Sequence, residues 1–203
     1  RSRREILFIG VGNEHRRDDG VGIFIVRHPA LLNLTGARVV EVQRDGICLM
    51  DLWKGAGIVF VFDAVYSRRT AGAVCRLDAV KERLPGDLFR LSTHTVGVPE
   101  AIELSRILNQ LPAELIIFGI EGKNFGQGKS LSMPCRRSAM QVIQRVSEEI
   151  QEREETQSPS RTGEGAPTAR AGAVWRTRPS RAPGTPSRLG VPRLPSASTT
   201  KSD

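Results

Sequence analysis

Near its start the chain reads Ile6-Leu7-Phe8-Ile9-Gly10-Val11-Gly12-Asn13, a short apolar run that ends in a glycine-rich turn. An apolar run of this length, bounded by glycine, is typical of a buried β-strand. Helical spacing follows the turn, because Phe24 and Ile25 lie three and four residues after Val21. A strand that turns directly into a helix predicts an α/β fold.

Four further runs rich in Ile, Val and Phe predict strands at residues 39–42, 58–62, 73–77 and 115–120. Segments with helical spacing lie at residues 98–108 and 139–150, and Ser132 and Pro134 mark the expected start of the last helix. We therefore expect a mostly parallel five-stranded sheet with helices on both faces. Such sheets bind ligands beyond the carboxyl ends of their strands.

Charge is distributed unevenly along the 203 residues, whose formal net charge is +8. Residues 1–155 contain 22 Lys and Arg against 20 Asp and Glu, whereas residues 156–203 contain 8 against 2. The second part also holds seven of the twelve prolines and has no apolar period. We expect one α/β domain over residues 1–155 and a disordered Arg-, Pro- and Ser-rich tail over 156–203. Three interpretations of the tail stay open: an arm for nucleic acid or an acidic partner, a solvated extension, and a segment that is not native coding sequence.

Three cysteines without a CxxC pair argue against a disulfide framework and a zinc ribbon. This cysteine usage suits a reducing compartment, so the cytoplasm is the expected location. No apolar run approaches about 18 residues, which predicts no transmembrane helix and no membrane partner. The basic start and its apolar stretch of about eight residues also argue against a signal peptide.

Polar residues close several of the predicted strands, and all of them are expected on one rim of the sheet. They are Asn13 to Asp19, Asp45, Asp63 and Glu121. A dinucleotide fingerprint is excluded, because His15 occupies its third glycine position and Asp18 and Asp19 would repel a pyrophosphate. Either acid has a structural alternative as a helix cap, and the cap interpretation is stronger for Asp18.

The chain has three histidines, and they differ in their surroundings. His28 is expected to have a structural role at the end of the first helix, where a cation suits the helix dipole. His15 lies in a charged loop. His94 is the better candidate for a site, because small hydroxyl residues flank it and a helix follows.

Three motifs together resemble the hydrogenase maturation protease family, over about residues 5–152. They are Ile9-Gly10-Val11-Gly12-Asn13 with Asp18-Asp19-Gly20-Val21-Gly22, then Phe62-Asp63-Ala64, then Ser92-Thr93-His94-Thr95-Val96-Gly97. The resemblance implies that Asp19, Asp63 and His94 form one catalytic, metal-binding cluster. It also implies removal of a C-terminal extension from the large subunit of a nickel-iron hydrogenase.

The sequence departs from the family pattern in two places before the tail. The segment after the second strand reads Asp45-Gly46-Ile47-Cys48 where the family often has Asp-Gly-Gly-Thr, so Asp45 and Gly46 are what remains of the expected substrate loop. Met133 separates Ser132 from Pro134, where the family usually has Ser-Pro. The tail has no counterpart expected in the family.

Two carboxylates and one imidazole suit Ni²⁺, Zn²⁺ or a similar divalent ion with open coordination positions. The resemblance implies no tightly bound cofactor, with the nickel held by the substrate recognised and zinc able to occupy the same site. The expected activity is that of an aspartic or metal-dependent-type endopeptidase, a hydrolase whose partner is the large-subunit precursor.

Two alternatives stay open at this stage: a hydrolase similar to peptidyl-tRNA hydrolase, and a catalytically idle relative that binds the precursor. The nearly neutral charge of residues 1–155 argues against a nucleic-acid partner.

Overall fold

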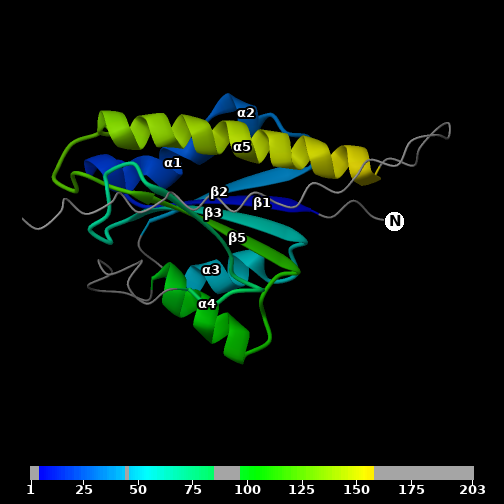
Figure 1. Ribbon diagram of the computed structural model, residues 1–203. Coiled ribbons are helices and arrows are strands. Elements are labelled where there is room, and N and C mark those ends of the chain that lie inside the picture. The colour runs from blue at the N-terminus through cyan, green and yellow to red at the C-terminus, as the bar shows by residue number, and fades with distance from the viewer. Residues whose placement is uncertain (1–4, 44–45, 85–96, 158–203) are drawn as a thin grey trace, which may run out of the picture.

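The computed structural model describes residues 5–43, 46–84 and 97–157, which form a sheet with helices on both faces (Figure 1). The strands are β1 (Ile6–Val11), β2 (Ala37–Val42), β3 (Ile58–Val65), β4 (Val74–Asp78) and β5 (Glu114–Glu121). The helices are the 3₁₀ helix η1 (Arg17–Gly20), α1 (Val21–Val26), α2 (Pro29–Leu32), α3 (Gly46–Trp53), α4 (Val98–Ile107) and α5 (Met133–Gln157). The predicted α/β class and all five predicted strands are confirmed.

The strand order is β2-β1-β3-β5-β4. The first four strands in this order are parallel, whereas β4 is antiparallel to β5 at one edge. After β1 the chain forms β2 on one side of β1, and it then returns to form β3 on the other side of β1. The carboxyl ends of β1 and β3 therefore form a topological switch point, where a crevice for ligands is expected.

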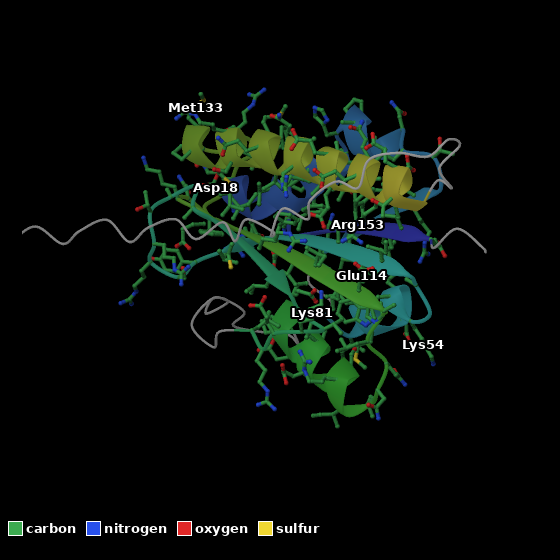
Figure 2. All side chains as sticks on the ribbon, turned by 45° about the vertical axis from the view of Figure 1, so that its right-hand side comes forward. Asp18, Lys54, Lys81, Glu114, Met133 and Arg153 are labelled. Atoms are coloured by element: carbon green, nitrogen blue, oxygen red, sulfur yellow. The ribbon has the colours of Figure 1, made fainter. Side chains whose placement is uncertain are left out.

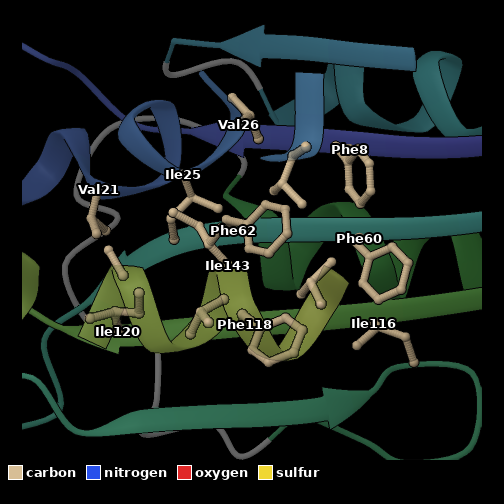
Figure 3. Close-up of a cluster of buried hydrophobic side chains, with 14 of the residues drawn as sticks. Phe8, Val21, Ile25, Val26, Phe60, Phe62, Ile116, Phe118, Ile120 and Ile143 are labelled. Atoms are coloured by element: carbon tan, nitrogen blue, oxygen red, sulfur yellow. The ribbon is translucent and has the colours of Figure 1, made fainter. Parts of the chain in front are cut away.

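One hydrophobic core lies between the sheet and the α1, α2 and α5 side (Figure 3). Phe8, Phe60, Phe62 and Phe118 form its aromatic centre, and the rings of Phe62 and Phe118 stack with centroids 5.7 Å apart. Ile143 of α5 packs against them. Aromatic and β-branched side chains from alternate strand positions thus fix α5 across the sheet.

The second core lies under α3 and α4 and takes the strand residues of opposite parity, such as Leu7 and Val59. Trp53 of α3 is fully buried there, and its indole N–H donates to Ser105 Oγ of α4 over 3.2 Å. Helix α3 differs from the sequence-based expectation, which places a loop at its first three residues, Gly46 to Cys48. Its apolar face buries Leu49, Met50 and Trp53 against the sheet.

The expected start of the last helix is confirmed, since α5 begins at Met133 with Pro134 in its first turn. The expectation for His28 is wrong in its detail, because α1 ends at Val26 and His28 is the N-cap of α2. Its Nδ1 accepts a hydrogen bond from the Ala30 N–H over 3.3 Å. The role is structural, as predicted, but it is that of a cap at the start of a helix.

Helix α5 runs two residues past the predicted domain boundary, to Gln157. The predicted tail, apart from its first two residues, lies outside the described residues. Within the described ranges, no helix combines the length and apolar character that a membrane span requires.

Candidate functional site

The glycine-rich turn after β1 brings Asp19 back to the end of that strand. Gly12 has φ 131°, and a Cβ at this position would overlap the carbonyl oxygen of Asp19. The Asn13 N–H donates to the same carbonyl over 3.3 Å. Only glycine permits this backbone conformation and this close approach, so the turn fixes where Asp19 lies.

A second close approach joins α1 to β3. A Cβ on Gly22 would overlap the carbonyl oxygens of Phe62 and Val11. The absence of a side chain lets the start of α1 pack directly on the strand that carries Asp63. The two glycine positions thus bring the segment of Asp19 and the segment of Asp63 to the same edge of the sheet.

Asp63 lies within β3 rather than after it, opposite Gly119 of β5. It has the same parity as Val59 and Val61, which pack in the core under α3 and α4. Its side chain therefore belongs to the α3 and α4 side of the sheet. Asp63 and Asp19 are both half-buried.

The two carboxylates influence each other electrostatically. Burial raises the pKa of Asp63 to about 8, and the negative charge of Asp19 contributes to the same direction, while a hydrogen bond from the Ala64 backbone opposes it. Two acids in such a site disfavour double ionisation. At neutral pH the pair can hold one proton, or can be neutralised by a cation.

The other two side chains predicted to act at this site, His94 and Asp45, lie outside the described residues. Gly46 is described, and it is the buried first residue of α3. Among residues 5–43, 46–84 and 97–157, no three His, Cys, Asp or Glu side chains are grouped so that they could hold a metal ion. The grouping of Asp19, Asp63 and His94 therefore stays a prediction.

Helix α4 begins on the side of Figure 1 where α5 also begins. The Glu100 carboxylate accepts the Gly97 N–H over 2.8 Å at this start. Because α4 leads to the amino end of β5, its own amino end faces the carboxyl edge of the parallel strands. Asp63 lies toward the same edge.

Asp18 is fully buried and has a role that the sequence did not reveal. Its Oδ2 accepts the N–H groups of Lys123 and Asn124 over 2.8 and 2.9 Å, and its Oδ1 accepts the Ser132 N–H over 2.6 Å. Neither η1 nor α1 has a side-chain cap, so the predicted capping of this helix start by Asp18 is wrong. The carboxylate instead joins the loop after β1 to the segment between β5 and α5.

Burial by itself would raise the pKa of Asp18, but the hydrogen bonds from Ser132, Lys123 and Asn124 outweigh it and lower the pKa. Asp18 also raises the pKa of the neighbouring Cys135 thiol, which burial already raises, to about 12. Asp18 is therefore ionised and Cys135 is a neutral thiol at physiological pH.

Glu121, predicted as one member of the polar rim, is likewise buried and structural. Its carboxylate accepts the N–H groups of Ser67 and Arg69 and the Ser67 hydroxyl, over 2.7 to 3.2 Å. It fixes the loop between β3 and β4. Apart from the family resemblance, no sequence signal identified Asp18 and Glu121 as buried anchors, because the loops that donate to them are distant along the chain.

The comparisons with known proteins all lead to the same protein family. A model of the hydrogenase maturation protease family (HycI) matches residues 37–150, more than half of the chain. The hydrogenase expression/formation protein HupD of Thiocapsa roseopersicina is 29% identical over 127 residues, which are 60% of this chain and 56% of HupD. The match thus spans little more than half the length of this curated relative.

Solved structures with the same fold include two proteins named HybD. The hydrogenase maturating endopeptidase HybD from E. coli has TM-score 0.58 and 17% identity, covering 73% of this chain and 93% of that protein. The NiFe hydrogenase maturation protease HybD from Thermococcus kodakarensis has TM-score 0.56 and 23% identity, covering 72% and 98%. The family match over residues 37–150 and the shared fold show that this chain belongs to the hydrogenase maturation protease family.

Proposed function

We propose that this chain is an endopeptidase that removes the C-terminal extension of a nickel-iron hydrogenase large-subunit precursor after nickel insertion. Membership of the hydrogenase maturation protease family supports the class of reaction and of substrate. The single observation that carries the site is that the close backbone approaches at Gly12 and Gly22 bring the segments of Asp19 and Asp63 to the switch point between β1 and β3.

The proposed site consists of Asp19, Asp63 and His94, which recognise the nickel that the precursor already holds. Binding of a divalent cation between two carboxylates is favourable, because the cation removes the repulsion between their charges. Oxygen and imidazole ligands suit nickel as well as zinc. Three side chains leave open positions, so the substrate's own ligands can remain on the metal.

This arrangement supplies a check on the substrate. A precursor without nickel leaves the repulsion between Asp19 and Asp63 in place and lacks the group that His94 would contact. A correct substrate supplies the ion that completes the site, and binding energy is then available to position the peptide bond for cleavage. The proposal assigns the three residues to metal recognition at the reacting centre.

The test is incubation of the full chain with precursor purified in nickel-loaded and nickel-free forms, followed by mass spectrometry of the precursor. We expect the nickel-loaded form alone to lose its C-terminal extension. Asp63→Asn and His94→Ala should abolish the cleavage, whereas Asp51→Asn, at an exposed position on α3, should retain it.

Three results would contradict the proposal in different ways. Equal cleavage of both precursor forms would remove the metal-sensing role. Full activity in either site variant would remove that residue from the site. Binding of the precursor without cleavage by the wild type would identify the chain as an idle relative.

A further inference from the structure

Three loops meet at the carboxyl edge of the sheet, next to Asp19. They are residues 13–19, residues 66–73 and residues 122–132. Loops 13–19 and 122–132 are joined by backbone hydrogen bonds, including Arg17 N–H to Gly128 O over 2.7 Å and Gly128 N–H to His15 O over 2.9 Å. Loops 66–73 and 122–132 meet through Tyr66 and Phe125, whose rings contact edge to face at 6.0 Å.

The three loops carry six Lys and Arg side chains, which we call the cationic rim. They are Arg16, Arg17, Arg68, Arg69, Lys123 and Lys129. Within the part of the chain that the structure describes, none of the six forms a salt bridge. Arg16 and Arg17 donate their Nε–H groups to the carbonyl oxygens of Phe125 and Gln127, over 3.3 and 2.9 Å, and neither guanidinium group is paired with a carboxylate of residues 5–43, 46–84 or 97–157.

The acidic residues of the same region offset the charge of the rim only in part. Glu14 is paired with Arg27 over 3.0 Å and also interacts electrostatically with Lys129. Asp18 and Glu121 are buried and bind backbone N–H groups. Asp19 interacts electrostatically with Asp63 in the proposed catalytic site, at the same carboxyl edge of the sheet as the rim.

The backbone under the rim is held in an uncommon conformation. Arg17 and Arg68 have φ of 51° and 63°, in the left-handed region that non-glycine residues rarely adopt. The conformation of Arg17 is fixed by the hydrogen bonds of the neighbouring Asp18 carboxylate and by the bond from the Arg17 N–H to Gly128 O. The conformation of Arg68 is fixed by the Glu121 carboxylate, which accepts the N–H of the next residue, Arg69. Two buried carboxylates therefore stabilise strained loops whose outward groups are arginines, which is a pattern typical of a functional surface.

A shallow cavity of about 720 Å³ lies within the rim. Asn13, His15, Arg16 and Lys129 line it together with residues 125–128. The lining is mixed: Arg16 and Lys129 bring positive charge, and Phe125 contributes to the apolar part. The cavity therefore offers cations and N–H donors to an extended chain that carries carboxylates.

We propose that the cationic rim is the docking surface for an acidic segment of the precursor polypeptide, close to the bond that is cut. This inference rests on the proposed function. Charge complementarity would steer the precursor to the edge where Asp19 and Asp63 lie. A neutral peptide bond, rather than a carboxylate, would then face the two acids.

RNA fits the rim less well than an acidic peptide. Single strands are bound through exposed aromatic faces on which bases stack. Tyr66 and Phe125 are the only aromatic residues of the three loops, and they pack against each other.

The test compares Arg16→Glu/Lys129→Glu with the matched control Lys54→Glu/Arg83→Glu. All four side chains are exposed, and both variants change the net charge equally. Lys54 precedes β3 and Arg83 follows the antiparallel β4, so the control lies at the opposite edge of the sheet. Figure 2 shows Lys54 on the far side of the molecule from Asp18. Thermal unfolding by circular dichroism checks that both variants fold.

Binding is measured by fluorescence anisotropy with the full chain and labelled short peptides of alternating Glu and Gly or alternating Lys and Gly, and with a short single-stranded RNA. We expect the Glu peptide to bind the wild type and the control, more weakly as salt increases, and to bind the rim variant about tenfold more weakly. With nickel-loaded precursor, KM should rise about tenfold in the rim variant and less than twofold in the control, with a smaller change in kcat.

The inference would be overturned if the Glu peptide bound equally to the rim variant and the control. It would also be overturned if the wild type cleaved the precursor and the two variants had equal KM values. Neither result would contradict the proposed function. RNA binding that is tighter than Glu-peptide binding and is lost in the rim variant would also overturn it, in favour of a nucleic-acid partner. A wild type that binds the Glu peptide through the rim but does not cleave the precursor would contradict the proposed function alone.

Discussion

Asp18→Asn should destabilise the protein strongly, although the substitution keeps the size and shape of the side chain. The wild-type carboxylate is fully buried and accepts three backbone N–H groups. The amide oxygen of asparagine can replace Oδ2 for Lys123 and Asn124, but the amide NH₂ would then face the Ser132 N–H. One hydrogen bond is lost, the other two lose their charge assistance, and the Ser132 N–H and the amide NH₂ are both left without an acceptor, so we expect a loss of about 2–4 kcal/mol in the free energy of unfolding.

Asp18→Ala removes all three acceptor contacts and should cost more, about 3–5 kcal/mol. The matched control is Asp51→Asn, because Asp51 is exposed on α3 and its replacement should change stability by less than about 0.5 kcal/mol. Urea unfolding followed by circular dichroism at about pH 7 measures all three variants against the wild type.

The effect should also depend on pH, with a defined sign. The pKa of Asp18 is lowered from its ordinary 3.8 in the folded state. A carboxyl with a lowered folded-state pKa contributes stability above its unfolded-state pKa and loses it as the pH falls through the folded-state value. The difference between wild type and Asp18→Asn should therefore be full at about pH 7 and shrink below about pH 4. Equal stability at neutral pH, or a difference that grows in acid, would refute this reasoning.

Three further perturbations test other parts of the structure. The folded-state pKa of Asp63 is raised to about 8, so the contribution of this side chain to stability is present below about pH 4 and is lost as the pH rises toward 8. In urea unfolding, the free energy of unfolding of Asp63→Asn should therefore gain on that of the wild type as the pH rises from about 4 to about 9, by about 2 kcal/mol after reduction for solvent screening. Gly22→Ala should lose about 1–3 kcal/mol or more, because its Cβ would overlap the carbonyl of Phe62; thermal unfolding unchanged from wild type would contradict the tight packing. Deletion of residues 158–203 should change the unfolding free energy by less than about 0.5 kcal/mol, since their composition cannot form a core; a larger loss measured by urea titration would show that the tail packs on the domain.

The strands could be predicted from the sequence because a fully buried parallel strand must be apolar on both faces. Ile6 to Ile9 and Ile58 to Phe62 satisfy this requirement without help from distant residues. Helix α5 was also predicted, since its apolar residues repeat with helical spacing. Helix α3 was missed, because a helix of eight residues carries too short a pattern and is stabilised by contacts such as that of Trp53 with Ser105.

The sequence by itself determined the α/β class, the run of strands and the resemblance that selected Asp19 and Asp63. Without the resemblance, composition and spacing could not show that Asp18 and Glu121 are buried structural anchors whereas Asp19 and Asp63 interact with each other. Tertiary structure decided the difference, because whether a carboxylate meets backbone N–H donors or a second carboxylate depends on which loops lie beside it. Those neighbours are about 50 to 115 residues away along the chain. Only the folding of the sheet brings them together, and with them the six cations of the rim.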